Sequence, residues 1–118
     1  MLNVMSGQVA LVVDDDPVIQ RVVGFWLLDA GFSIMSAGSA EEALKMLGDR
    51  RPDVVVTDFR LPGISGSELA HRIKTETESP PPVFMMSAYP QPVPFEGDRF
   101  FSKPDQLIDM IRSIAGYA

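Results

Sequence analysis

Short runs of apolar residues recur along the chain without polar alternation, and polar or turn-forming residues follow each run. Such runs are typical of strands buried on both faces, as at the centre of a parallel sheet. The clearest run is Val54, Val55 and Val56, which leads through Thr57 to Asp58 and then into a turn. The pattern predicts strands at 8–13, 32–37, 53–57, 83–86 and 99–102.

Between these runs, apolar residues recur at the three- and four-residue spacing of helices. Asp16 followed by Pro17 is a favourable helix start, because Asp is a good N-cap and Pro suits the first helical position. The sequences Ser-Ala-Glu-Glu at 39–42 and Ser-Gly-Ser-Glu at 65–68 are capping boxes. The predicted helices cover about 17–30, 39–48, 65–75 and 105–115. The inward residues of the last helix are expected to be Leu107, Ile108, Ile111 and Ile114.

Strands and helices alternate, except between the fourth and fifth strands, where Pro90, Pro92 and Pro94 fall within five residues. Proline lacks a backbone N–H and restricts the residue before it, so no ordinary helix is expected here. The alternation predicts an α/β fold with a parallel sheet and helices on both faces. The fourth helix of that fold is expected to be degenerate.

Length and charge narrow the class of protein. The chain has 118 residues, which suits a single domain over 1–118 with its core at 8–115. Its net charge of −6 argues against nucleic-acid binding, and the absence of cysteine excludes disulfides and thiolate metal sites. The longest apolar run, 22–28, is too short to cross a bilayer. We therefore expect a cytoplasmic protein, monomeric by default, with neither a nucleic-acid nor a membrane partner.

Polar side chains follow four of the predicted strands: Asp14 and Asp15 after the first, Asp58 after the third, Ser87 after the fourth and Lys103 after the fifth. The carboxyl ends of parallel strands lie along one edge of a sheet, so these side chains should converge. Neighbouring carboxylates need a counter-charge, and Mg²⁺ suits an all-oxygen site. With a lysine and a hydroxyl nearby, the set fits phosphoryl transfer, in which an aspartate nucleophile would form an acyl phosphate.

Four segments of the sequence carry these residues: Leu-Val-Val-Asp-Asp-Asp-Pro at 11–17, Val-Val-Thr-Asp-Phe-Arg-Leu-Pro-Gly at 55–63, Met-Met-Ser-Ala at 85–88 and Phe-Phe-Ser-Lys-Pro at 100–104. In this order they resemble the signature segments of response-regulator receiver domains. The resemblance covers residues 8 to 115. It implies the flavodoxin-like (CheY-like), doubly wound fold, with five parallel strands in the order 2-1-3-4-5.

The resemblance also implies roles for the acidic residues. Asp58 would be the phosphoacceptor and would share a site for Mg²⁺ (or Mn²⁺) with Asp14 and Asp15. Asp15 would bind the metal directly, and Asp14 mainly through a metal-bound water. The backbone carbonyl of Arg60 would be a further ligand.

The other signature residues would respond to the phosphoryl group. By resemblance, Ser87 would hydrogen-bond it, Lys103 would form an ion pair with it, and the bond before Pro104 would be cis. Phe100 falls at the aromatic switch position of the family. Arg60 and Tyr89, two residues after the phosphoacceptor and the hydroxyl, would tune the phosphoryl lifetime.

The implied partner is a histidine kinase or a histidine phosphotransfer protein that docks near Val18, in the first helix. No separate enzyme activity is implied beyond self-catalysed phosphoryl transfer and slow autodephosphorylation. One departure from the family matters: Ser87 and Lys103 are several residues closer than in typical members. A similar shortening occurs in some receivers associated with histidine kinases, which favours a phosphorelay or phosphate-sink role.

Two other functions stay open at this point. The segment from Asp14 to Val18 also satisfies the Asp-x-Asp-x-Val pattern of haloacid-dehalogenase-type phosphatases, in which Asp14 would be the nucleophile and Asp16 the general acid. The other alternative is a receiver-like docking module that takes no phosphoryl group.

Overall fold

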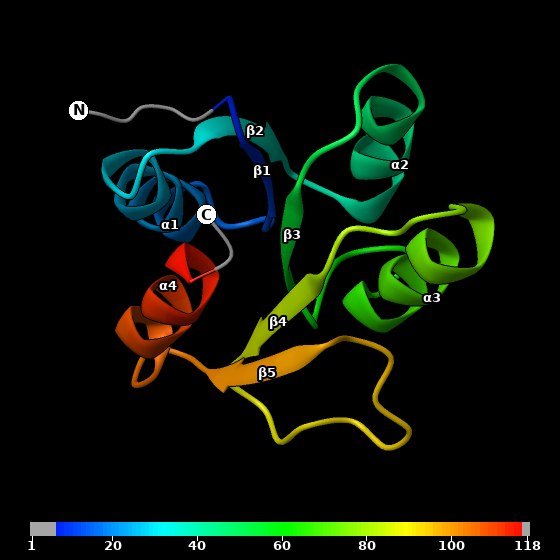
Figure 1. Ribbon diagram of the computed structural model, residues 1–118. Coiled ribbons are helices and arrows are strands. Elements are labelled where there is room, and N and C mark those ends of the chain that lie inside the picture. Colours follow the sequence, from blue (N-terminus) through cyan, green and yellow to red (C-terminus); the bar gives the residue numbers. More distant parts are fainter. Residues whose placement is uncertain (1–6, 117–118) are drawn as a thin grey trace.

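Five parallel strands form one sheet in the computed structural model, which describes residues 7–116. The strands lie in the order β2-β1-β3-β4-β5, and every neighbouring pair is parallel (Figure 1). Their bounds are β1 (Val9–Val13), β2 (Ser33–Ala37), β3 (Val54–Asp58), β4 (Val83–Ser87) and β5 (Arg99–Ser102). The predicted fold class and strand order are confirmed. The ends of the predicted 1–118 domain lie outside the described residues, and its bounds stay a prediction.

Four helices in the described part of the chain cover the sheet, with α1 and α4 on one face and α2 and α3 on the other (Figure 1). Their bounds are α1 (Pro17–Asp29), α2 (Ala40–Asp49), α3 (Gly66–Glu76) and α4 (Leu107–Ala115). The side chains of Asp16, Ser39 and Ser65 each accept a hydrogen bond from a backbone N–H in the first helical turn, which confirms the three N-caps. The glutamates of the two predicted capping boxes bond elsewhere, Glu42 to the N–H of Gly38 and Glu68 to Arg72. No helix within 7–116 is long and apolar enough to cross a membrane.

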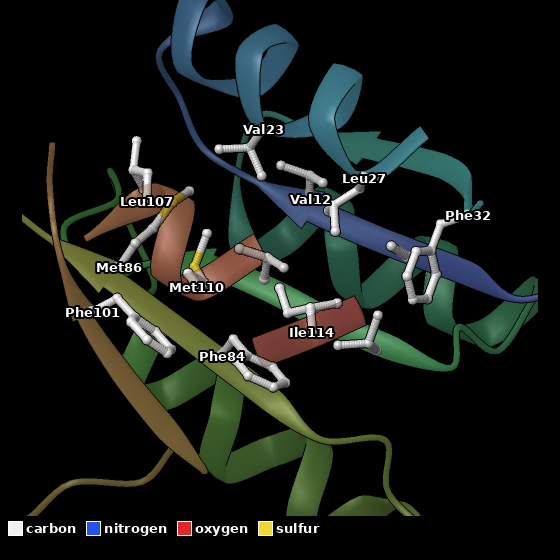
Figure 2. Close-up of a cluster of buried hydrophobic side chains, with 13 residues drawn as sticks. Val12, Val23, Leu27, Phe32, Phe84, Met86, Phe101, Leu107, Met110 and Ile114 are labelled. Carbon is white, nitrogen blue, oxygen red and sulfur yellow. The ribbon is translucent and has the colours of Figure 1, made fainter. Parts of the chain in front are cut away.

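The sheet separates two clusters of buried apolar side chains. On the α1 and α4 face, alternate strand residues such as Val12 and Met86 pack with Leu27 and Met110 (Figure 2). The cluster on the α2 and α3 face contains the strand residues that lie between them in sequence and point to the opposite side of the sheet. Its buried members include Leu11, Val13, Val55, Met85, Ala43, Leu69 and Ile73. Burial on both faces explains why the strand sequences lack polar alternation.

Residues 88–98, all of them described, contain no helix, and a loop connects β4 to β5 instead (Figure 1). We call this segment the β4–β5 loop. The prediction that the fourth helix of the fold is degenerate is therefore confirmed, and α4 is the helix after β5. One aromatic residue of the loop, Phe95, packs against the cluster on the α2 and α3 face.

The last helix differs from its prediction in two respects. It begins at Leu107 rather than near 105, because residues 103–106 form a turn after β5. Its fully buried stripe contains Leu107, Met110 and Ile114, whereas Ile108 is 54% exposed, so the inward prediction for Ile108 is wrong. The side of α4 that carries Ile108 lines an open groove against α1 and does not face the sheet.

Candidate functional site

Three carboxylates meet at the carboxyl ends of β1 and β3. These strands are parallel neighbours, with Val13 opposite Thr57, so the residues that follow Val13 lie beside Asp58. One oxygen from each of Asp14, Asp15 and Asp58 lies within 4.8 Å of the others. Asp14 and Asp58 are buried, and Asp15 is exposed. A cluster of hard oxygen donors that opens to solvent on one side fits a divalent cation such as Mg²⁺, which keeps several of its waters.

Lys103 supplies the positive charge that faces these acids. Its Nζ lies 3.2 Å from Asp58 Oδ2 and 3.4 Å from Asp14 Oδ2. The backbone N–H of Lys103 donates to the carbonyl of Ser87 at 2.8 Å, and the Lys103–Pro104 peptide bond is cis. The end of β5 is thus held against the end of β4, with the ammonium aimed at the two buried carboxylates.

The charges in the site do not balance by themselves. Burial raises the pKa of Asp14 and of Asp58 above the usual 3.8, and the nearby ammonium and backbone donors only partly offset this effect. Burial alone would lower the pKa of Lys103, but the two carboxylates together raise it above its usual 10.5. Two buried negative groups thus share one positive partner, and a bound cation would relieve the imbalance.

This imbalance predicts how stability depends on pH and Mg²⁺. Because the folded-state pKa values of Asp14 and Asp58 are raised, their ionisation destabilises the metal-free fold at neutral pH. This destabilisation decreases as the pH falls through the raised pKa values of the folded state towards the usual 3.8. Mg²⁺ at one hundred times its Kd should stabilise the fold by about 2.7 kcal/mol at pH 7.

The Mg²⁺ effect should shrink over the same acid range, because protonated carboxylates bind the cation poorly. Thermal unfolding with and without Mg²⁺ at several pH values, compared with Asp58→Asn, measures both effects. An Mg²⁺ effect of equal size at pH 7 and at pH 4 would contradict this account.

Two residues that sequence reasoning did not single out, Thr57 and Gly66, fix the end of β3. Thr57 Oγ1 donates to the carbonyl oxygen of Asp58 at 2.9 Å. The first turn of α3 passes so close that a Cβ at Gly66 would overlap that same carbonyl oxygen. Gly66 therefore lets α3 begin directly against the site. The available signal was a glycine at a first helical position, where it adds nothing to helix propensity.

Gln20, also missed, ties α1 to the site. Its Nε2 donates to the carbonyl of Asp14 at 3.1 Å and to that of Ala37 at 3.0 Å, where β1 and β2 end. Asp14 Oδ1 in turn accepts from the N–H of Asp16 at 2.8 Å. A polar residue on the sheet-facing side of an apolar helix was the only sequence signal for this role.

The remaining predicted residues surround the cluster or lie farther out. Ser87 is fully buried, and its Oγ accepts from the N–H of Tyr89 at 2.9 Å. The Arg60 guanidinium carbon lies 4.5 Å from the centre of the Tyr89 ring, a cation–π contact. Phe100 is half-buried on the α2 and α3 face, and Val18, in the first turn of α1, is 61% exposed.

The fold is a doubly wound α/β domain, and its charged site lies at the carboxyl ends of the strands, where sheets of this kind bind ligands. A sequence model of the family described as response regulator receiver domain matches residues 10–112, and the chain belongs to this family. It is thus a receiver domain of the kind found in two-component response regulators. This family consists of signalling domains and is not a class of enzymes.

Curated relatives carry the same domain within longer proteins. The phosphate regulon transcriptional regulatory protein PhoB of Pseudomonas aeruginosa is 36% identical over 85 residues, which make up 71% of this chain and 37% of that protein. A protein-glutamate methylesterase/protein-glutamine glutaminase of Haloarcula marismortui is 35% identical over 131 aligned residues, 93% of this chain and 35% of that protein. The chain thus spans about a third of the length of these relatives.

Solved receiver structures share the fold. The response regulator TrrA of Thermotoga maritima, crystallised in complex with Mg²⁺ and BeF, has a TM-score of 0.85 and 27% identity, covering 94% of this chain and 99% of that one. A CheY-like receiver domain of Methylobacillus flagellatus has a TM-score of 0.84 at 23% identity, covering 96% of this chain and 100% of that one, and shows the fold alone.

Proposed function

We propose that Asp58 accepts a phosphoryl group, in an Mg²⁺-dependent reaction, from a phosphohistidine on a histidine kinase or histidine phosphotransfer protein. The observation that carries this proposal is the pairing of the Asp58 carboxylate with Lys103 at 3.2 Å, beside the carboxylates of Asp14 and Asp15. A buried nucleophile, a cation site and a fixed ammonium are the parts that phosphoryl transfer requires.

In the proposed reaction, an Asp58 carboxylate oxygen attacks phosphorus. A P–O bond forms, the P–N bond to the imidazole breaks, and the imidazole leaves with the electron pair and takes up a proton. Lys103 neutralises charge on the phosphoryl oxygens, and Ser87 donates a hydrogen bond to one of them once its hydroxyl turns towards the group. Mg²⁺, held by Asp14, Asp15, Asp58 and the carbonyl of Arg60, would supply Lewis-acid charge neutralisation.

We further propose that the chain catalyses no reaction beyond its own phosphorylation and slow autodephosphorylation, and that it works within a phosphorelay or as a phosphate sink. The shortened connection between β4 and β5 supports a role of that kind. The cytoplasmic location and monomeric state expected from the sequence stay predictions.

The stacked Arg60 and Tyr89 side chains are expected to slow hydrolysis of the acyl phosphate, because together they restrict the approach of water to Asp58. Replacing both with alanine should shorten the phosphoryl lifetime about tenfold, a barrier change of about 1.4 kcal/mol. The decay of the phosphorylated protein after removal of the donor measures this lifetime. Arg50→Ala, at an exposed position away from the stack, is the control. An unchanged lifetime in the double variant would remove Arg60 and Tyr89 from the mechanism.

Val18 is expected to lie within the docking surface for the phosphodonor. It is exposed in the first turn of α1, directly after the acidic residues of the site. Val18→Asp should slow transfer from a phosphohistidine protein by about tenfold or more, because it places an unpaired charge in the interface. Phosphorylation by a small-molecule donor should be unchanged. Equal slowing with both donors would mean that Val18 acts on the site and not on docking.

Phosphotransfer profiling tests the whole proposal. The chain would be mixed with a panel of autophosphorylated histidine kinases and phosphotransfer proteins, with Asp58→Asn as the control. Rapid transfer from at least one donor to the wild-type chain alone is the expected result. A chain that gains no phosphoryl group from these proteins or from a small-molecule donor would be a docking module instead.

A further inference from the structure

The β4–β5 loop replaces a helix and runs from the end of β4 to the beginning of β5 (Figure 1). Val93, near its middle, is 95% exposed. Its C-terminal part is fixed to α3 and β4: Lys74 Nζ lies 2.8 Å from Asp98 Oδ1, and Asp98 Oδ2 accepts from the N–H of Val83 at 2.7 Å. Glu96 Oε1 lies 3.2 Å from His71 Nδ1 of α3, and the Arg60 guanidinium carbon lies 4.5 Å from the centre of the Tyr89 ring. Two further contacts involve residues that are expected to respond to phosphorylation.

The first of these contacts is made by Phe95. Its ring lies edge-on to the ring of Phe100, with the ring centres 6.0 Å apart and an angle of 87° between the planes. The loop folds tightly around this ring, since a Cβ at Gly97 would lie only 2.8 Å from Phe95 Cζ. Phe100 lies on β5, the outermost strand of the sheet, and pairs in register with Met85 of β4. Phe95 thus covers Phe100 on the face where a helix would otherwise lie.

The second contact is at the beginning of the loop, where Ser87 Oγ accepts a hydrogen bond from the N–H of Tyr89 at 2.9 Å. A Ser87 hydroxyl that turned to donate to a phosphoryl group on Asp58 would move away from this amide. Ser87 and Phe100, two of the residues expected to respond to phosphorylation, therefore both contact the loop.

We propose that Phe95 is a positioning residue that couples Phe100 to the β4–β5 loop, so that phosphorylation of Asp58 releases the loop. This inference rests on the proposed function. In the unphosphorylated protein, Phe95 holds Phe100 in its present position and the loop against the sheet. When Phe100 moves, Phe95 loses its partner and the loop separates from the sheet. A contact made in only one of two states must oppose any ligand that favours the other state, by the same factor.

The test uses the full chain with Mg²⁺ and beryllofluoride, which mimics the phosphoryl group. Phe95→Ala should bind the mimic about threefold to tenfold more tightly, because an edge-to-face aromatic pair no longer favours the unmodified state. Fluorine NMR of bound beryllofluoride measures this affinity. In the wild type, the mimic should speed amide exchange at Tyr89, whose N–H donates to Ser87 Oγ in the unmodified protein. In Phe95→Ala this amide should exchange faster than in the wild type even without the mimic.

Val93→Ala is the matched control, since it removes an exposed side chain from the same loop and should change neither measurement. Phe95→Leu should restore part of the wild-type behaviour. If Phe95→Ala does not fold, the single variants Phe95→Leu and Phe100→Leu are measured in its place. A Phe95 variant that loses thermal stability but binds the mimic like the wild type would overturn the inference and leave the proposed function intact. A wild type that neither binds the mimic nor takes a phosphoryl group on Asp58 would overturn both.

Discussion

Asp58→Asn is expected to abolish phosphorylation of the protein by small-molecule and protein donors alike. Asparagine has nearly the same shape as aspartate but lacks the anionic oxygen that attacks phosphorus, so no acyl phosphate can form. The loss should exceed a thousandfold and leave no labelled protein above background. Intact-protein mass spectrometry after incubation with a small phosphodonor and Mg²⁺ measures it directly.

The same variant should fold at least as well as the wild type without metal. Burial raises the pKa of the Asp58 carboxyl, and Asp14 competes with it for Lys103, so removing one charge leaves a balanced pair. Unfolding of the variant should occur at an equal or higher temperature, and added Mg²⁺ should stabilise it less than the wild type. Residual phosphorylation in this folded variant would show that the nucleophile lies elsewhere.

Lys103→Met is expected to have the second largest effect. The substitution keeps most of the side-chain volume but leaves Asp14 and Asp58, both buried, without a positive partner. The metal-free protein should lose about 3 kcal/mol of stability, at the lower end for a broken buried ion pair because the Lys103 side chain is 15% exposed. Phosphorylation by a small donor should slow about a hundredfold, since the ammonium no longer offsets charge on the phosphoryl oxygens.

Two control variants separate the effect of the Lys103 charge from the effect of replacing any lysine and from the effect of changing the side-chain shape at position 103. Lys45→Met removes a lysine from an exposed position on α2 and should change neither stability nor phosphorylation measurably. Lys103→Arg keeps the charge and should retain more stability than Lys103→Met, although its longer, planar head group fits the site less well. Mg²⁺ should recover part of the stability lost in Lys103→Met. A Lys103→Met variant phosphorylated at the wild-type rate would contradict the proposed role.

The fold could be predicted because its signals are local. The apolar strand sequences, the caps at Asp16, Ser39 and Ser65, and the prolines of the β4–β5 loop each act within a few residues. Convergence of the site was also predictable, because parallel strands bring the residues after their carboxyl ends to one edge whatever the details of packing. Asp14 and Asp58 meet for this reason, although 44 positions separate them.

Contacts that depend on the path of the chain were not predictable. Gln20 forms hydrogen bonds to two carbonyls at strand ends, and Gly66 lies close to Asp58. To predict these contacts one must know the distance between a helix and a strand, and the periodicity of the sequence does not give that distance. Helical spacing placed Ile108 inward, but only the side of α4 facing the sheet is covered. Phe95 could not be paired with Phe100 from sequence, because the proline-rich segment excludes a helix without specifying a loop.

The position of the acyl phosphate tests the central claim most directly. Wild-type protein would be phosphorylated with a small donor and Mg²⁺, reduced with borohydride to fix the modified aspartate as homoserine, digested, and sequenced by mass spectrometry. The proposed function predicts modification of Asp58 alone. Modification of Asp14 would instead support the phosphatase-like nucleophile, and a chain with no modified aspartate would contradict phosphorylation altogether.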